Sequence, residues 1–166
     1  MKTIISVLVE NRSGVLSRTA GLFARRGFNI ESLAVGETED PTVSRMTIVV
    51  EGDDRIVEQV GKQLNKLVDV IKVRELPAET STRRELALIK VNASSKNRGQ
   101  INELVEIMKA KIVDISPTTL TVEIVDRPER VTQFLGMVMP YGVVEIARTG
   151  MIAMQKGSEA LMITEQ

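Results

Sequence analysis

The residues best placed to bind a ligand lie in a short polar turn, residues 11–16, between an apolar run and a helical pattern. A helix that begins here leaves its first backbone N–H groups without intrahelical partners. Gly14 removes the side chain that would block access to these groups. Because such N–H groups and the helix dipole favour negative charge, the turn is suited to a carboxylate or a phosphate.

A second polar residue of interest is Asn29, which lies between Phe28 and Ile30 in a strand-like run. A buried amide in such a strand is costly unless it has a hydrogen-bond partner, so we expect Asn29 to face one. Simpler explanations exist for the turn itself. Asn11 would satisfy the turn's own backbone in an Asx-turn, and Gly14 would serve only the backbone conformation.

Residue types that are missing exclude most catalytic chemistry. The 166 residues include no His and no Cys, which removes imidazole acid–base catalysis, thiolate nucleophiles and the common zinc ligands. Lys+Arg and Asp+Glu both total 22, so the basic surface typical of a nucleic-acid-binding protein is not expected. No apolar run has the length of a signal peptide or of a membrane span. We therefore expect a cytoplasmic protein that binds neither nucleic acid nor membrane.

The elements that position the turn follow a repeated order. Hydrophobic periodicity predicts strand, helix, strand, strand, helix, strand over 3–10, 15–26, 28–36, 44–51, 56–67 and 68–74. The first helix places its apolar residues on one face: Val15, Leu16, Thr19, Leu22 and Phe23. The same order recurs over 85–93, 98–110, 112–115, 120–125, a helix that opens at Pro128, and 143–148.

The second halves of the two repeats align without a gap. TIVVEGDDRIVEQV and TVEIVDRPERVTQF share the order strand, acidic cap, Arg, apolar helix, which predicts Asp53 and Asp126 as helix caps. Two βαββαβ units of this kind predict an α+β fold of two ferredoxin-like domains. We expect the domains over 1–76 and 84–166, with a linker over 77–83. Because helices cover only one face of each sheet, the other face and the edges must be covered or paired, and we expect self-association.

The spacing of these motifs resembles a known regulatory domain. Asn11-x-x-Gly14-x-Leu16 after a strand, followed by a helix and Gly27-Phe28-Asn29-Ile30, is similar to the ACT domain, which binds amino acids. With Glu31-Ser32-Leu33 and Ser44-Arg45-Met46-Thr47, the chain resembles more specifically the regulatory (small) subunit of acetolactate synthase. The resemblance covers the whole chain and is strongest over residues 3–75.

This resemblance implies a regulatory role in branched-chain amino acid biosynthesis. It implies a non-catalytic subunit that activates a catalytic large subunit and confers feedback inhibition by valine. Thiamine diphosphate, magnesium and FAD are expected in that partner, and no cofactor in this chain. The resemblance also implies a homodimer through the ACT domain. Its effector site would combine Asn11, Gly14, Val15 and Leu16 of one chain with Asn29 and Ile30 of the other.

The chemistry of these residues suits an amino acid. The carboxylate would accept from backbone N–H groups around Gly14, and the ammonium would donate to the side-chain oxygen of Asn11 or Asn29. The branched side chain would lie against Leu16 and Ile30. Such a pocket rejects a missing methylene by only ~1–3 kcal/mol, so leucine and isoleucine are expected to compete. The alternative function is a free-standing ACT-type sensor that controls another enzyme or transcription.

Two other polar segments are weaker candidates. Glu37, Glu39 and Asp40 beside Pro41 are expected to form a solvated loop rather than a metal site. The loop 94–99 of the second repeat lacks the Asn-x-x-Gly-x-Leu spacing, so we expect no second amino-acid site there.

Overall fold

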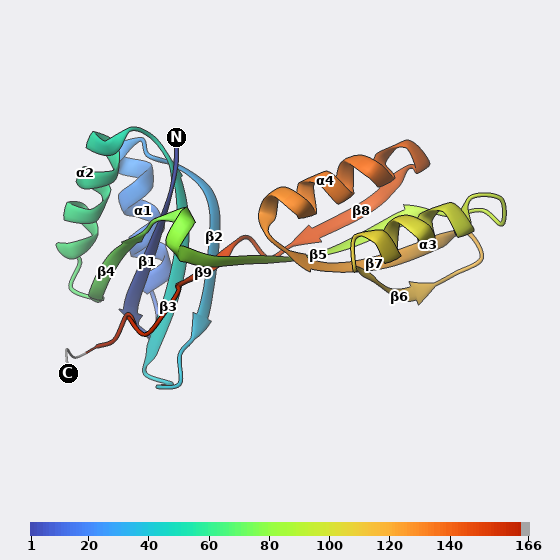
Figure 1. Ribbon diagram of the computed structural model, residues 1–166. Helices are drawn as coiled ribbons and strands as arrows, with labels where there is room; N and C mark the ends of the chain where they lie inside the picture. The colour runs from blue at the N-terminus through green and yellow to red at the C-terminus, as the bar shows by residue number, and fades with distance from the viewer. Residues whose placement is uncertain (164–166) are drawn as a thin grey trace. The chain divides into compact units, whose positions relative to one another are not determined.

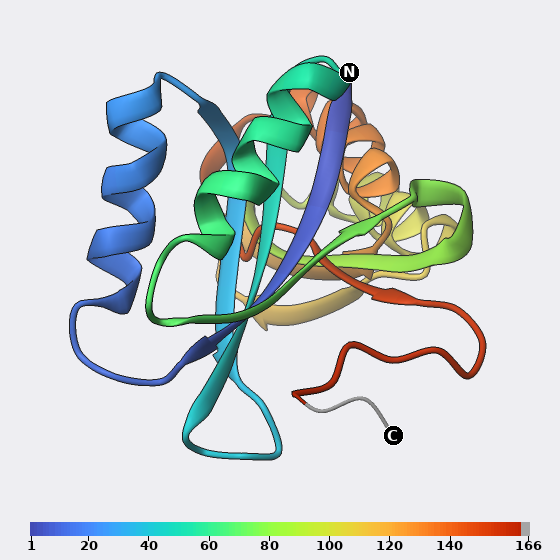
Figure 2. The same cartoon turned by 90° about the vertical axis from the view of Figure 1, so that its left-hand side faces the viewer.

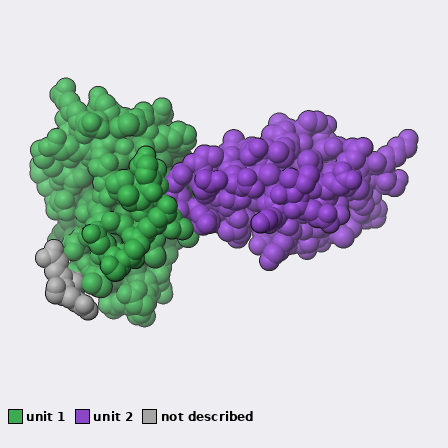
Figure 3. Space-filling model, in the orientation of Figure 1, with its two compact units in different colours: residues 1–82, 151–166 green, residues 83–150 purple. Residues whose placement is uncertain are grey.

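Two compact units make up the computed structural model, in which residues 1–163 are described (Figures 1 and 3). The first unit comprises residues 1–82 and the chain from Met151 onward, and the second comprises residues 83–150. Residues 151–163 therefore belong to the first unit, whereas the predicted range 84–166 assigns them to the second.

The first unit is a four-stranded antiparallel sheet with two helices on one face. Its elements are β1 (Lys2–Glu10), α1 (Val15–Arg26), β2 (Asn29–Glu37), β3 (Val43–Glu51), α2 (Asp54–Asn65) and β4 (Val70–Leu76). The strand order is β2-β3-β1-β4, so β2 and β4 are the edges. Figure 2 looks onto the face that α1 and α2 cover. Alternate strand residues and the apolar sides of both helices form the core there, with Val7, Phe23, Ile48, Val60 and Leu64 almost fully buried.

The ends of both helices follow local sequence signals. Gly27 ends α1 with φ 67°, a left-handed conformation that favours glycine, and its N–H donates to the Ala24 carbonyl at 3.3 Å. Asp53 caps α2 by accepting from the Ile56 N–H at 3.0 Å, as predicted. The predicted apolar face of α1 is wrong at Leu16, whose side chain is 48% exposed.

The face of the first sheet without helices is partly covered by the end of the chain. Ile4, Val49 and Leu76 form a small apolar cluster with Met151 and Ala153. Met151 directly precedes the short strand β9 (Ile152–Gln155), and Ala153 lies within this strand, which pairs with β5. Residues of the same chain therefore cover part of the helix-free face.

The second unit repeats the first in strand order. Its elements are β5 (Ser81–Asn92), α3 (Arg98–Ile107), β6 (Lys111–Ile115), β7 (Thr119–Asp126), α4 (Pro128–Val138), η2 (Met139–Tyr141) and β8 (Val143–Arg148). The order β6-β7-β5-β8 matches β2-β3-β1-β4 position by position. Its core includes Ile89, Ile101, Val122 and Phe134. The predicted α+β fold of two ferredoxin-like domains is confirmed.

Within the predicted linker, 77–83, Ala78–Thr80 form the short 3-10 helix η1 and β5 already begins at Ser81. One local prediction differs from the structure. Asp126 does not cap α4, whose N-cap is Arg127. Its carboxylate instead accepts from the Arg130 side chain at 2.7 Å. No helix within residues 1–163 has the length and apolar character needed to cross a membrane.

Candidate functional site

The 11–16 turn lies at the end of the first sheet where β1 ends and β3 begins. Glu10 pairs with Val43, and Glu37 at the end of β2 pairs with Ser44. The turn, the β2–β3 hairpin and the connection from α2 to β4 therefore gather at one end of the sheet, the lower end in Figure 2. Residues distant in sequence can act together there.

Backbone donors are open at the start of α1. Gly14 is the N-cap, with φ 85° in the left-handed region that L-residues rarely adopt. Its carbonyl accepts from the Arg18 N–H at 3.0 Å, and the Val15 N–H approaches the Arg12 carbonyl at 3.4 Å. Across residues 1–163, no backbone acceptor pairs with the N–H of Leu16 or Ser17. These two donors are available to an anion.

Asn11 ties the turn to the β2–β3 hairpin rather than closing an Asx-turn. Its Nδ2 donates to Oε1 of Glu37 at 3.1 Å and to the Pro41 carbonyl at 2.9 Å. Its backbone N–H donates to the Thr42 carbonyl at 2.7 Å. These hydrogen bonds use Nδ2, so Oδ1 is without a partner among residues 1–163 and remains an acceptor to which an ammonium group can donate.

Gly14 is also required by a close neighbour. A Cβ at this position would lie 2.6 Å from Nη1 of Arg18, so the guanidinium occupies the space that a side chain would take. Arg18 extends back along α1 over the turn and also approaches the Ser13 carbonyl. Gly14 therefore allows the left-handed backbone conformation, and it also leaves space for the Arg18 guanidinium next to the open N–H groups.

The buried carboxylate of Asp69 binds Arg12 of the turn and Arg18 of α1. Asp69 is only 2% exposed, directly before β4. Its Oδ2 accepts from Nε of Arg18 at 2.6 Å, and its Oδ1 accepts from Nε of Arg12 at 2.9 Å. Its carbonyl accepts from the Glu10 N–H at 2.9 Å. The hydrogen bond from Arg18 is the main reason that the pKa of Asp69 lies below its ordinary value, which keeps the carboxylate charged.

Sequence reasoning missed Asp69 because nothing local marks it. It lies 51 residues after Arg18, in a segment predicted as an ordinary closing strand.

The two apolar residues of the turn have different roles. Val15 is 4% exposed and packs in the helix-side core, so only its backbone is near the turn. Leu16, by contrast, leaves an apolar side chain in solvent beside the open N–H groups. Leu16 is therefore the apolar residue at this position that is free to contact a ligand or another chain.

Asn29 and Ile30 lie at the opposite end of the same sheet. Asn29 pairs with Glu51, which in turn pairs with Lys2, eight positions along β1 from Glu10. At about 3.4 Å per residue this is roughly 27 Å from the turn. Asn29 is exposed, so the argument from a buried amide is wrong, while Ile30 is half-buried. One chain alone does not bring the six predicted site residues together.

A hollow of about 440 Å³ adjoins the turn. Its lining consists of Glu10, Asn11, Arg12, Asp40, Thr42, Val43, Ile71 and Ile163. A hollow of this size has room for an amino acid. Of the predicted site residues Asn11 lies on its wall, whereas Gly14, Val15 and Leu16 do not line it.

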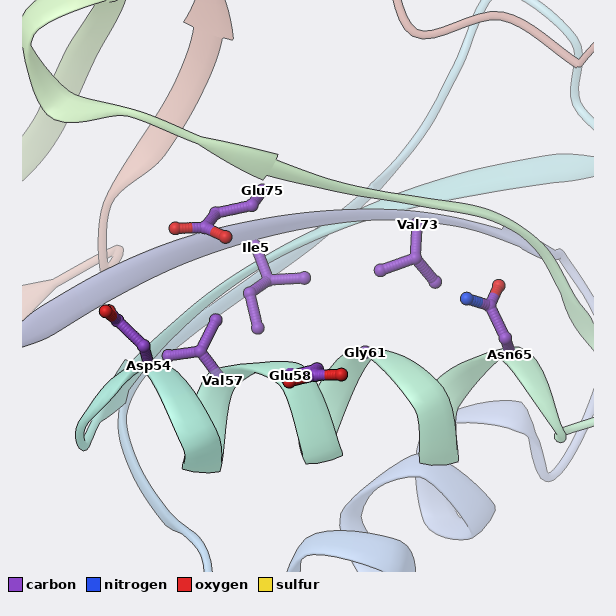
Figure 4. Close-up of a pocket in the computed structure, with 8 residues that line it drawn as sticks. All are labelled: Ile5, Asp54, Val57, Glu58, Gly61, Asn65, Val73 and Glu75. Carbon is purple, nitrogen blue, oxygen red and sulfur yellow. The ribbon is translucent and has the colours of Figure 1, made fainter.

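A second hollow, of about 360 Å³, lies between α2 and the edge strand β4 (Figure 4). Its floor is apolar, with Ile5, Val57 and Val73, and Glu58 and Glu75 lie on its rim. None of the predicted site residues lines it.

The remaining polar segments are satisfied locally. Asp40 accepts from the backbone N–H and the hydroxyl of Thr42, at 2.9 and 2.7 Å, which lowers its pKa. The described part of the chain holds no group of three acidic side chains arranged to bind a metal. In loop 94–99, Asn97 Oδ1 accepts from the Ser94 N–H at 2.7 Å, so the polar groups there bond to one another.

Family models match both units of the chain. One described as an AHAS small subunit-like ACT domain matches residues 5–72. A second, described as small subunit of acetolactate synthase, matches residues 84–157.

Individual relatives extend the similarity over nearly the full length. The chain is 55% identical over 159 residues to the probable acetolactate synthase small subunit of Archaeoglobus fulgidus, covering 96% of this chain and 99% of that one. It is 50% identical over 157 residues to the acetolactate synthase small subunit of Mycolicibacterium smegmatis, covering 95% and 92%. The crystal structure of the acetolactate synthase small subunit of Thermotoga maritima superposes with a TM-score of 0.90 at 43% identity, over 96% and 99% of the two chains.

Proposed function

The chain belongs to the family of acetolactate synthase small subunits, and we propose that it activates a catalytic large subunit and makes it sensitive to valine. In this proposal the large subunit holds thiamine diphosphate, magnesium and FAD and performs the chemistry. The lack of His and Cys in this chain supports a regulatory rather than a catalytic role.

The observation that carries the effector site is the group of unpaired donors at the start of α1. A valine carboxylate would accept from the N–H groups of Leu16 and Ser17, with the positive end of the helix dipole behind them. The valine ammonium would donate to Oδ1 of Asn11, and the isopropyl group would contact Leu16. The carboxylate, the ammonium and the isopropyl group of valine would thus each have a matching group on the protein.

A homodimer through the edge strand β2 would complete this site. Among residues 1–163, β2 pairs only with β3 in the first sheet, so its other edge is open to a second chain. Antiparallel pairing of two β2 strands about a two-fold axis places the start of one strand against the end of the other. The partner's Asn29 and Ile30 would then lie near Glu37 and the Asn11 turn of the first chain. The separation of roughly 27 Å within one chain is compatible with a site formed between two chains.

Valine would inhibit through linkage between quaternary states. A ligand that binds one arrangement of the regulatory dimer more tightly shifts the holoenzyme toward it, with a typical coupling of about 1–3 kcal/mol. Binding of the large subunit must then change valine affinity by the same factor.

Reconstitution with an acetolactate synthase large subunit tests the proposal. We expect this chain to raise acetolactate formation, valine to reverse the gain, and leucine and isoleucine to compete for the site. Calorimetric titration of valine should give different affinities with and without the large subunit. Equal affinities while inhibition persists would refute the linkage, and substantial acetolactate formation by the isolated chain would refute the regulatory role.

A further inference from the structure

The helix-free face of the first sheet carries two arginines that the proposed effector site does not use. Arg45 lies in β3 and Arg74 in β4. Strand pairing puts Ser6 of β1 opposite Arg74, and Leu8 of β1 opposite Arg45. Because residues opposite each other share a face and Ser6 and Leu8 alternate with the helix-side core, both guanidinium groups extend over the same face.

Neither arginine has a compensating carboxylate among residues 1–163. Nη1 of Arg74 is buried without a hydrogen-bond partner. Nη2 of Arg45 donates to a neutral acceptor, the Ala153 carbonyl, at 2.8 Å. Burial, and then the nearby charge of Arg74, lower the pKa of Arg45. Two partly buried like charges without an anion are unfavourable, since a desolvated charge normally requires a counter-charge.

A third polar group at the same place is also unsatisfied. Ser6 is fully buried, and its Oγ has no hydrogen-bond partner. Buried polar atoms in native proteins almost always have a partner, and an unpaired one calls for an explanation. The Ser6 hydroxyl and Nη1 of Arg74 therefore both have free hydrogen-bonding capacity on the same face of the sheet.

We propose that Arg45, Arg74 and Ser6 form an oxyanion-binding site that takes a carboxylate or phosphate group. Each planar guanidinium group presents N–H donors whose spacing fits the oxygens of a carboxylate or a phosphate. Such charge-assisted hydrogen bonds are stronger than neutral ones. The serine hydroxyl donates to a further oxygen. One anion thus satisfies the two unpartnered atoms and neutralises part of the charge.

The segment 151–155 contacts one of the two arginines. Ala153 supplies the oxygen that Arg45 binds, and both Ala153 and Met151 pack on Ile4 and Val49. An oxyanion that binds Arg45 replaces the Ala153 carbonyl at Nη2. Anion binding and packing of residues 151–155 on the sheet are therefore coupled.

Thermal denaturation of the full chain in sodium phosphate, with sodium chloride of equal ionic strength as reference, tests the site. We expect phosphate to raise the melting temperature of the wild type with a saturable dependence, and Arg45→Gln and Arg74→Gln to abolish the rise. Arg55→Gln is the matched control, because it removes an exposed arginine from the same unit and should keep the rise. A parallel titration with sodium acetate distinguishes carboxylate from phosphate, and a saturable effect of either anion supports the site.

Two results would overturn the proposal. One is a wild type that responds to neither anion beyond chloride. The other is an equal response in Arg55→Gln and both site variants, which would mark a general ionic effect. Circular dichroism checks that each variant is folded. Should Arg74→Gln fail to fold, Arg74→Lys replaces it, because lysine keeps the charge but lacks the planar pair of guanidinium N–H donors. An unchanged phosphate response in Arg74→Lys would equally contradict the proposal. Valine binding plays no part in these measurements, so they are independent of the effector site.

Discussion

Gly14→Asp separates ligand binding at the turn from folding of the turn. Gly14 has φ 85°, and a Cβ there meets Nη1 of Arg18 at 2.6 Å, the end of a long side chain that can shift. A non-glycine residue in this conformation costs about 1–2 kcal/mol, and Asp and Asn tolerate it best. Gly14→Asn is therefore the matched control, since it carries the same strain and nearly the same volume without the charge.

The charge of Gly14→Asp would oppose the effector's carboxylate. Two like charges about 6 Å apart at an effective dielectric constant of about 20 repel by roughly 3 kcal/mol, which is about a hundredfold in Kd. Pairing of the new carboxylate with Arg18 offsets part of this repulsion, so we expect valine affinity to fall by about tenfold to a hundredfold. Activation of the large subunit should be kept, because the sheet and the helix faces are unaltered.

Calorimetric titration of valine into the three proteins measures this difference. Acetolactate formation by the reconstituted enzyme, with and without valine, measures inhibition and activation separately. The reasoning is refuted if Gly14→Asn weakens valine binding as much as Gly14→Asp, because strain rather than charge would then be responsible. Loss of activation in both variants would mean that Gly14 serves folding.

Three further predictions follow from side chains of the first unit. Asp69→Asn should lower both the melting temperature and valine affinity. Its lowered pKa means that the carboxylate's contribution to stability is present above the ordinary value of 3.8 and is lost as pH falls through the folded-state value. The difference in melting temperature between Asp69→Asn and the wild type, measured by thermal denaturation at pH values from 7 to 3, should therefore shrink as the pH falls. Leu16→Ala should weaken valine binding with a stability change within about 0.5 kcal/mol, because the side chain is half exposed, whereas the buried Val15→Ala should cost about 1–3 kcal/mol in a urea titration. Met151→Ala should destabilise the first unit by about 2 kcal/mol, because the side chain is 7% exposed in the helix-free cluster, and an unchanged urea midpoint would contradict that packing.

Most of the fold was predictable because each element carries its own local pattern. The period-3.6 face of α1 and the acidic cap of α2 are readable from neighbouring residues alone. The repeat then predicted the second unit, since the same pattern implies the same strand order. The start of β5 at Ser81 was missed because residues 81–85 are all polar and no apolar run marks the strand there.

The candidate site was predictable only in part. The turn, Gly14 and Asn11 are marked by type and spacing, and the structure leaves donors open there. The residues that contact the turn, Asp69 and Glu37, carry no such local signal in the sequence. Asp69 comes to the turn through the pairing of β4 with β1, and Glu37 through the pairing of β2 with β3.

Local sequence determined that a helix begins at Gly14 with free N–H groups, because helix caps and glycine conformation depend on a few adjacent residues. It also determined the two βαββαβ units, through periodicities that hold within each element. Only the tertiary structure decided what surrounds these groups. It buried Asp69 against two arginines, placed Asn29 at the opposite end of the sheet from the turn, and put Arg45 and Arg74 on one face without a carboxylate partner among residues 1–163. Such pairings depend on strand order and register, which join residues tens of positions apart and leave no local signal in the chain.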